Sequence, residues 1–160
     1  NRSEILRQRG YLLIGGEGPL KERLLSMVQD YNLMPCLRLL GHIPEQDLPR
    51  LYQAADFFVL PTRHLEGFGL VILEALASGT PVLGTPVGAI PEVIGPFNES
   101  LLFKSAQWQD MMEKMEDVIQ RPEKYDIPPK ACRSFAEENF SWQRMSLAFE
   151  REALRIIRLI

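Results

Sequence analysis

The sequence has the composition of a globular domain without a surplus of positive charge. It contains 160 residues, of which 46 % are hydrophobic and 24 % charged, and its net charge at pH 7 is −3. A chain of this length can enclose one core of its own. Basic tracts are missing, so no nucleic-acid partner is expected. No apolar run approaches the roughly 20 residues that span a membrane.

The cysteines indicate the cellular compartment, and the first residues indicate whether the sequence is part of a longer protein. Cys36 and Cys132 are too few for a disulfide framework, and we expect reduced thiols in a cytoplasmic protein. The start, NRSEILRQRG, is too highly charged for a signal peptide. Because it lacks an initiator methionine, we expect the chain to be a fragment of a longer protein.

Short apolar runs alternate with helical patterns along the chain. The apolar runs predict strands at residues 11–14, 37–41, 56–61, 80–84 and 100–103. The segments between and after them predict helices at 19–32, 45–55, 69–79, 89–94, 108–122, 129–138 and 141–158, with Gly79 as one stop and Ser141 as one cap. The strands lack polar alternation, as expected when both faces of a sheet are covered. The sequence therefore predicts a doubly wound, Rossmann-like α/β domain with a parallel sheet.

The segment 61–88 is the first candidate for function, because ligands of such sheets bind at the carboxyl ends of strands. It holds two acids, Glu66 and Glu74, with Gly-Phe-Gly between them. Glycines and the free N–H groups of a helix start suit a phosphate or diphosphate. Glu74, about one turn into the helix, can accept hydrogen bonds from sugar hydroxyls. If the N–H groups bind a phosphate and the acids bind hydroxyls, the ligand is a nucleotide with a sugar attached. From the spacing alone, a plain tight turn and an acid placed for the helix dipole are the simpler explanation.

The same segment carries a family resemblance. EGFGLVILEALASGTPVLGTPVGAIPEVI (66–94) resembles the signature of retaining GT-B glycosyltransferases, specifically glycosyltransferase family four, the glycosyl transferases group 1. Glu66 and Glu74 have the spacing of the family's two glutamates. LLIGGEGP, LRLLGHIPEQDLPRLYQAADFFVLPT and ENFSW follow the family's order. The resemblance runs from about Tyr11 to Trp142 and implies the C-terminal, donor-binding half of a GT-B fold.

The resemblance implies a role for each matching residue. Glu74 would bind the ribose hydroxyls of a nucleotide-sugar donor linked to UDP, GDP or ADP. Glu66 would be the catalytic residue and contact the transferred sugar, as nucleophile or as electrostatic stabiliser. The other donor-binding residues would be Gly67, Phe68, Gly69, Leu70 and Val71 at the diphosphate or sugar, His42, Ile43 and Pro44 at the base, Gly16 and Gly18 in a turn at the cleft, and Arg63 as a basic group. The family needs no metal and no cofactor.

The sequence also departs from the family. The strand and the Arg/Lys loop that normally open this domain do not precede YLLIGGEGP. We therefore expect weak nucleotide binding. The N-terminal domain, which would bind a sugar, lipid or other hydroxyl acceptor, is expected to be absent from residues 1–160. We therefore expect that the chain alone does not catalyse sugar transfer. A non-catalytic module that binds a nucleotide-sugar or a protein is the main alternative, and another GT-B enzyme class, such as a sugar-nucleotide epimerase, is the weaker one.

The last helix combines apolar and basic residues. Leu147, Leu154, Ile157 and Ile160 fall near one face, and Arg151, Arg155 and Arg158 lie largely elsewhere. Such a helix can dock on an anionic membrane. The resemblance instead favours a helix that packs back on the N-terminal domain.

Overall fold

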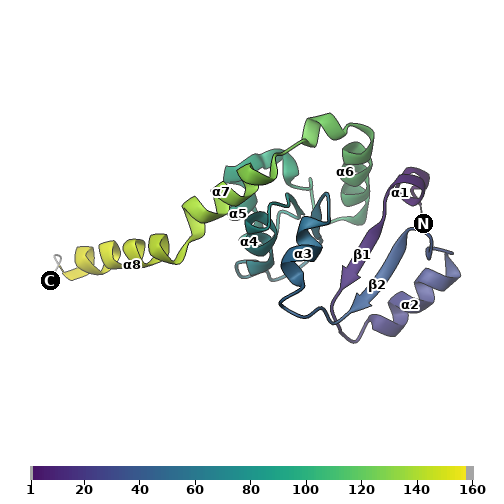
Figure 1. Ribbon diagram of the computed structural model, residues 1–160, viewed down its shortest axis with the longest axis horizontal. Coiled ribbons are helices and arrows are strands. Elements are labelled where there is room, and N and C mark those ends of the chain that lie inside the picture. The colour runs from purple at the N-terminus through teal and green to yellow at the C-terminus, as the bar shows by residue number, and fades with distance from the viewer. Residues whose placement is uncertain (1, 158–160) are drawn as a thin grey trace.

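Helices and strands alternate through most of the chain. The computed structural model describes residues 2–157 (Figure 1). In chain order the elements are α1 (Glu4–Arg9), β1 (Leu12–Gly15), α2 (Lys21–Asp30), β2 (Leu37–Gly41), α3 (Leu48–Gln53), β3 (Phe58–Leu60), α4 (Leu70–Ala77), β4 (Val82–Gly84), α5 (Ile90–Asn98), the 3-10 helix η1 (Glu99–Leu101), α6 (Trp108–Gln120), the 3-10 helix η2 (Pro122–Tyr125), α7 (Pro129–Phe140) and α8 (Trp142–Ile157). The predicted order is confirmed for four strands and the helices between them. Helix α1 was not predicted.

The strands are parallel, as predicted, but they form two separate pairs. β1 pairs with β2 from Leu12–Leu37 onward, and β3 pairs with β4 from Phe58–Val82 onward. Among residues 2–157 no strand pairing joins the two pairs into one sheet. The doubly wound α/β class is confirmed. The single continuous sheet is replaced by two parallel ribbons.

The fifth predicted strand, residues 100–103, is wrong. Its first residues form η1, where the Asn98 side chain accepts a hydrogen bond from the Ser100 N–H at 3.0 Å. A single parallel bridge joins Leu102 to Gly84, and the Phe103 N–H donates to the Gly84 carbonyl at 2.8 Å. Local capping by asparagine competes here with strand formation. The segment therefore pairs with β4 through a single bridge.

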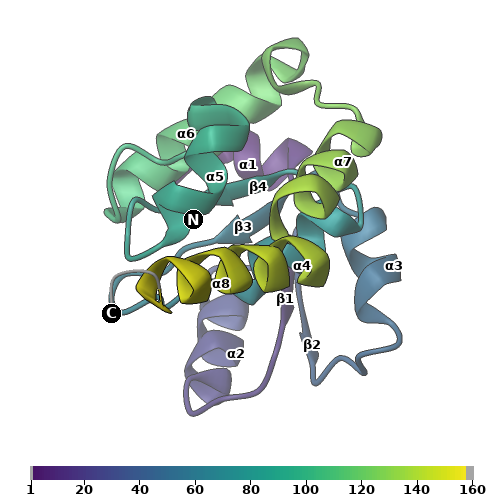
Figure 2. The ribbon, with the colours of Figure 1, turned by 90° about the vertical axis from the view of Figure 1, so that its left-hand side faces the viewer.

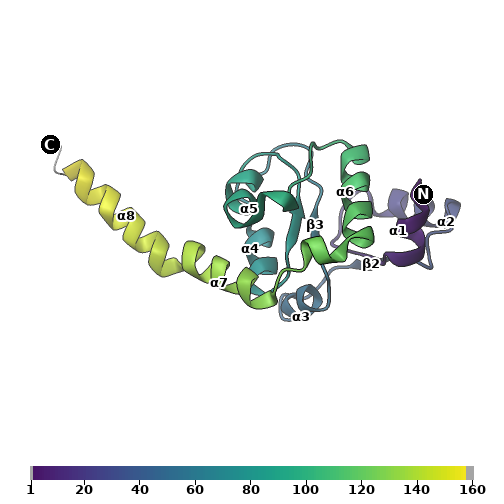
Figure 3. The same ribbon diagram turned by 90° about the horizontal axis from the view of Figure 1, so that it is seen from above.

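The core lies where β3 and β4 meet α4 and α5. Figure 3 shows α4 and α5 on one side of β3 and α6 on the other, so helices cover both faces of this pair. The largest fully buried side chains come mainly from these elements: Ile72, Leu76, Val82, Leu83, Ile90, Val93, Ile94, Leu101 and Phe103. Burying one such side chain contributes about 1.5–3 kcal/mol. This packing fixes the loops that leave β3 and β4.

The β1–β2 pair lies beside this core together with α1 and α2 (Figure 1). Helix α1 is capped by Ser3, whose hydroxyl accepts from the Leu6 N–H at 3.2 Å, and it packs on α6. The apolar run at β1 is less covered than predicted, with Tyr11 61 % and Leu12 44 % exposed. The expectation that every strand is buried on both faces is wrong for β1.

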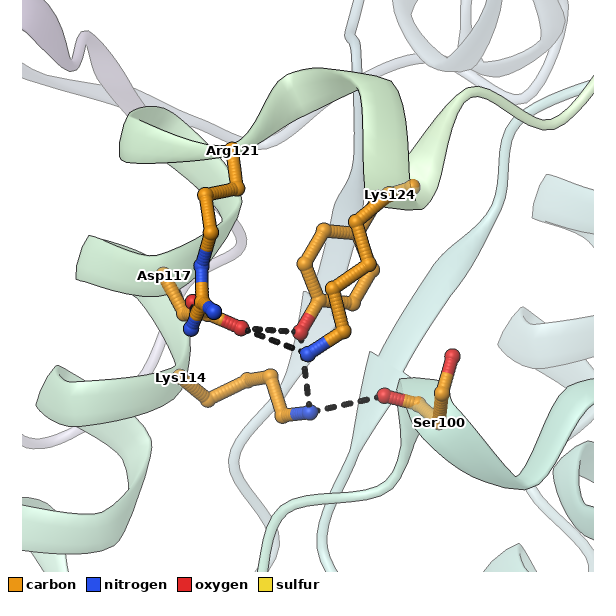
Figure 4. Close-up of polar contacts among 6 residues, drawn as sticks. Ser100, Lys114, Asp117, Arg121 and Lys124 are labelled. Carbon is orange, nitrogen blue, oxygen red and sulfur yellow. Dashed lines mark hydrogen bonds and ion pairs between the residues drawn. The ribbon is translucent and has the colours of Figure 1, made fainter.

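A charged cluster joins α6 to η1 and η2 (Figure 4). The Asp117 carboxylate accepts hydrogen bonds from Arg121, from Lys124 at 3.1 Å and from the Tyr125 hydroxyl at 2.5 Å. Lys114 donates to the Ser100 carbonyl at 2.8 Å. Burial alone would raise the pKa of Tyr125, but the ammonium groups of Lys114 and Lys124 together lower it. The cluster thus ties η1 and η2 to α6.

Helix α7 packs on α4, and α8 extends from it away from the rest of the chain as an arm (Figures 1 and 2). The predicted cap Ser141 is confirmed, since its hydroxyl accepts from the Arg144 N–H at 3.5 Å. The apolar side chains of α8 are exposed, with Trp142 at 82 %. Arg158 and Ile160, which the sequence analysis placed on this helix, lie outside the described residues. Between residues 2 and 157, no helix has the length and apolar character needed to cross a membrane.

The two cysteines are expected to differ sharply in reactivity. Cys132 on α7 is fully buried, and burial raises the pKa of its thiol to about 11. This lowers the reactive thiolate fraction at neutral pH about a hundredfold. Cys36 is only half-buried. Titration of the native protein with a disulfide reagent should label Cys36 quickly and Cys132 only after unfolding. Cys36→Ser should remove the fast phase, and two thiols reacting at one rate would contradict the structure.

Candidate functional site

The loops after β1 and β2 meet at the carboxyl ends of these strands. The Gly16 N–H donates to the Gly41 carbonyl at 2.7 Å, and both residues have positive φ, 119° and 69°. A Cβ on Gly15 would lie 2.2 Å from the Ile43 side chain. The structure thus brings together two predicted groups, the glycine turn with Gly16 and the loop that begins at His42. His42 itself is exposed.

Glu66 lies in the loop after β3 and is held from two directions. The Thr62 hydroxyl donates to Glu66 Oε2 at 3.3 Å. Thr85, which is fully buried directly after β4, donates to the Thr62 carbonyl at 2.6 Å. Gly88 lies so close that a Cβ there would be 2.1 Å from the Glu66 carbonyl oxygen. The loop after β4 therefore supports the loop that carries the predicted catalytic acid.

Helix α4 begins at Gly69, in the middle of the predicted site. Gly69 has φ 73°, a left-handed conformation that favours glycine, and a Cβ there would lie 2.9 Å from the end of the Ile72 side chain. No side chain of the described residues caps this end of α4. The first N–H groups of a helix have no acceptor within it and carry partial positive charge. The start of α4 can therefore accept an anionic group.

Glu74 projects from α4 and is exposed, but its carboxylate has one fixed partner. The Tyr52 hydroxyl donates to Glu74 Oε2 at 3.2 Å. Burial first, and then the nearby Glu74 charge, raises the pKa of Tyr52 to about 12. The tyrosine therefore stays protonated and remains a donor at neutral pH. Tyr52 is not among the residues predicted from the sequence, because the contact joins residues that are 22 positions apart.

The remaining predicted residues differ in their exposure to solvent. Gly67, Leu70 and Arg63 are exposed, and Val71 is half-buried. The Phe68 ring packs edge-on against Phe140 of α7, with ring centroids 5.9 Å apart. Its position is thus set partly by α7.

Most of the predicted site residues are exposed to solvent. One cavity of about 880 Å³ lies elsewhere, at the amino ends of β3 and β4, where Asp56, Phe57 and Pro81 line it together with α6 and η2. None of the predicted site residues lines it. Across residues 2–157, no group of three or more His, Cys, Asp or Glu side chains is placed to hold a metal ion.

Comparison with known proteins assigns the family. The family model of the glycosyl transferases group 1 matches residues 3–135. The chain belongs to this family. The resemblance to retaining GT-B enzymes of glycosyltransferase family four is therefore confirmed, and so is the Rossmann-like class expected for their C-terminal domain.

The curated relatives of this glycosyltransferase-family chain are considerably longer than the chain. It is 33 % identical over 162 residues to a D-inositol 3-phosphate glycosyltransferase of Saccharomonospora viridis, covering 96 % of this chain and 37 % of the relative. It is 43 % identical over 84 residues to O-antigen chain mannosyltransferase B of Escherichia coli, covering 52 % of this chain and 22 % of the relative. The chain thus spans less than two fifths of the length of these relatives.

Solved structures share the fold. Sucrose-phosphate synthase of Thermosynechococcus elongatus matches with a TM-score of 0.76 and 26 % identity, over 98 % of this chain and 41 % of that one. The Anabaena protein HepE, solved in complex with UDP-glucose, matches with a TM-score of 0.75 and 20 % identity, over 94 % of this chain and 43 % of that one. At 20 % identity the second match concerns the fold alone.

Proposed function

We propose that this chain is the donor-binding domain of a retaining glycosyltransferase, which transfers a sugar from a nucleotide-sugar to an acceptor hydroxyl. The observation that carries the proposal is the placement of Glu66 and Glu74 on either side of the uncapped start of α4, each held by a hydroxyl donor. Membership of the family and the UDP-glucose complex of HepE support it.

The two acids divide one ligand between them. The N–H groups at the start of α4 face the diphosphate, because partial positive charge there compensates an anion. Glu74, one turn further along, accepts hydrogen bonds from the ribose hydroxyls. Glu66, before the helix, contacts the sugar that is transferred. The loop from His42 to Pro44 lines the base, and the glycine turn at Gly16 lets the ligand approach the backbone.

The reaction breaks the bond between the anomeric carbon and the diphosphate oxygen and forms a bond to the acceptor oxygen, with retained configuration. The leaving nucleoside diphosphate takes the electron pair and accepts the proton that the acceptor hydroxyl loses, and α4 stabilises its charge. Glu66 stabilises positive charge that develops on the sugar. We propose that the acceptor is held by a further domain, so this chain binds donor without turning it over. Exposed Arg63 and a helix end equivalent to about half a charge compensate a diphosphate only in part.

Titration of the 160-residue chain with UDP, GDP, ADP and their glucose and mannose conjugates tests the proposal. We expect weak, saturable binding that prefers one base, and weaker binding of the matching nucleoside without phosphates. Calorimetry or ligand-observed NMR measures both. If none of these nucleotides binds, or if nucleoside and diphosphate bind equally, α4 does not serve a diphosphate and the proposal fails.

A further inference from the structure

Tyr52 is a buried side chain that reaches the predicted ribose site from a different helix. It lies in the last turn of α3, only 8 % of its surface is exposed, and its hydroxyl donates to Glu74 Oε2 at 3.2 Å. Glu74 belongs to the family motif, whereas Tyr52 lies 22 residues earlier in the chain. An exposed glutamate on a helix otherwise samples several rotamers. This hydrogen bond restricts Glu74 to one of them.

The position of the Tyr52 hydroxyl is itself fixed by two other elements. The ring packs edge-to-face on Phe58 of β3, with centroids 5.3 Å apart and planes at 87°. The Tyr52 carbonyl accepts a hydrogen bond from the Thr80 hydroxyl at 2.6 Å, and Thr80 is buried just before β4. α3 packs on α4 as well. The ring of Tyr52 is thus anchored to β3, and its backbone to the segment just before β4.

A carboxylate held at one oxygen still has acceptor capacity at the other. With Oε2 engaged by Tyr52, Oε1 is free to accept from a ligand hydroxyl without first losing rotamer freedom. We propose that Tyr52 is a positioning residue that presents the Glu74 carboxylate to the hydroxyls of the bound nucleotide. This inference rests on the proposed function, because the hydroxyls are those of the donor ribose.

The test compares two nucleotides on Tyr52→Phe, which keeps the ring and removes the hydroxyl. The probes are whichever of UDP, GDP and ADP binds most tightly, and its 2′,3′-dideoxy analogue. We expect Tyr52→Phe to weaken the ribonucleotide about threefold to tenfold and to leave the dideoxy analogue unchanged. A purely structural role would weaken both nucleotides alike.

Tyr125→Phe is the matched control. Tyr125 is the other tyrosine buried against a carboxylate, since it donates to Asp117 in the cluster of Figure 4. This variant should change neither affinity, and thermal unfolding should show all three proteins folded. If Tyr52→Phe keeps the full preference for the ribonucleotide, or weakens both nucleotides equally, the inference is overturned while the proposed function stands. If the unaltered chain shows no preference for the ribonucleotide, the ribose contact of the proposed function fails and Tyr52 has no ligand to serve.

Discussion

Glu74→Ala is expected to lower the affinity for a nucleoside diphosphate at least about tenfold. Hydrogen bonds to a charged group contribute about 1.5–3 kcal/mol, and 1.4 kcal/mol corresponds to tenfold. The helix should persist, because alanine has the highest helix propensity and Glu74 is exposed. The fall in affinity should therefore reflect the lost contact and not unfolding. Isothermal titration of both proteins with the preferred nucleotide measures it.

The matched control for this change is Glu113→Ala. Glu113 is an exposed glutamate inside α6, a helix that contributes no residue to the predicted site. Its removal changes the net charge by the same amount, so it corrects for any general electrostatic effect on an anionic ligand. We expect no change of affinity in this variant. Equal affinities of the unaltered chain and Glu74→Ala would show that Glu74 does not bind the nucleotide.

Gly88→Ala is expected to destabilise the chain and to displace Glu66. Gly88 has φ 56°, which costs an alanine about 1–2 kcal/mol. Its Cβ would also lie 2.1 Å from the Glu66 carbonyl oxygen, which is backbone and cannot swing aside. We expect a loss of about 2–4 kcal/mol in the free energy of unfolding, or about 5–15 °C in the midpoint. Thermal unfolding measures the first effect, and binding of the nucleotide-sugar conjugate measures the displacement.

Gly67→Ala provides the comparison for Gly88→Ala in thermal unfolding. Gly67 is exposed, its φ is not positive, and a Cβ at this position would meet no neighbouring atom within 4 Å. The same glycine-to-alanine change should therefore leave the midpoint unchanged or raise it slightly, because alanine lowers the conformational entropy of the unfolded chain. If Gly88→Ala unfolds at the same temperature as Gly67→Ala, the close approach of the two loops is not a constraint on the fold.

Much of the local structure could be predicted because its causes are local. Gly79 ends α4 with φ 93°, and Ser141 caps α8, as predicted. Prediction failed where competing short-range interactions decided the outcome. The apolar run at 100–103 looks like a strand, but the Asn98 cap turns its first residues into η1. The short helix α1 carries too few apolar residues to produce a clear periodic pattern.

The sequence by itself determined the family, the order of the elements and the two acids around Gly69, because these depend on residues within one motif. Only the tertiary structure decided what holds those acids. The Tyr52–Glu74 and Thr62–Glu66 hydrogen bonds exist because α3 packs on α4 and because Thr80 and Thr85, at the two ends of β4, anchor the neighbouring segments. Such contacts depend on how buried surfaces meet. No periodicity or spacing along the chain predicts these contacts, because the surfaces belong to separate elements.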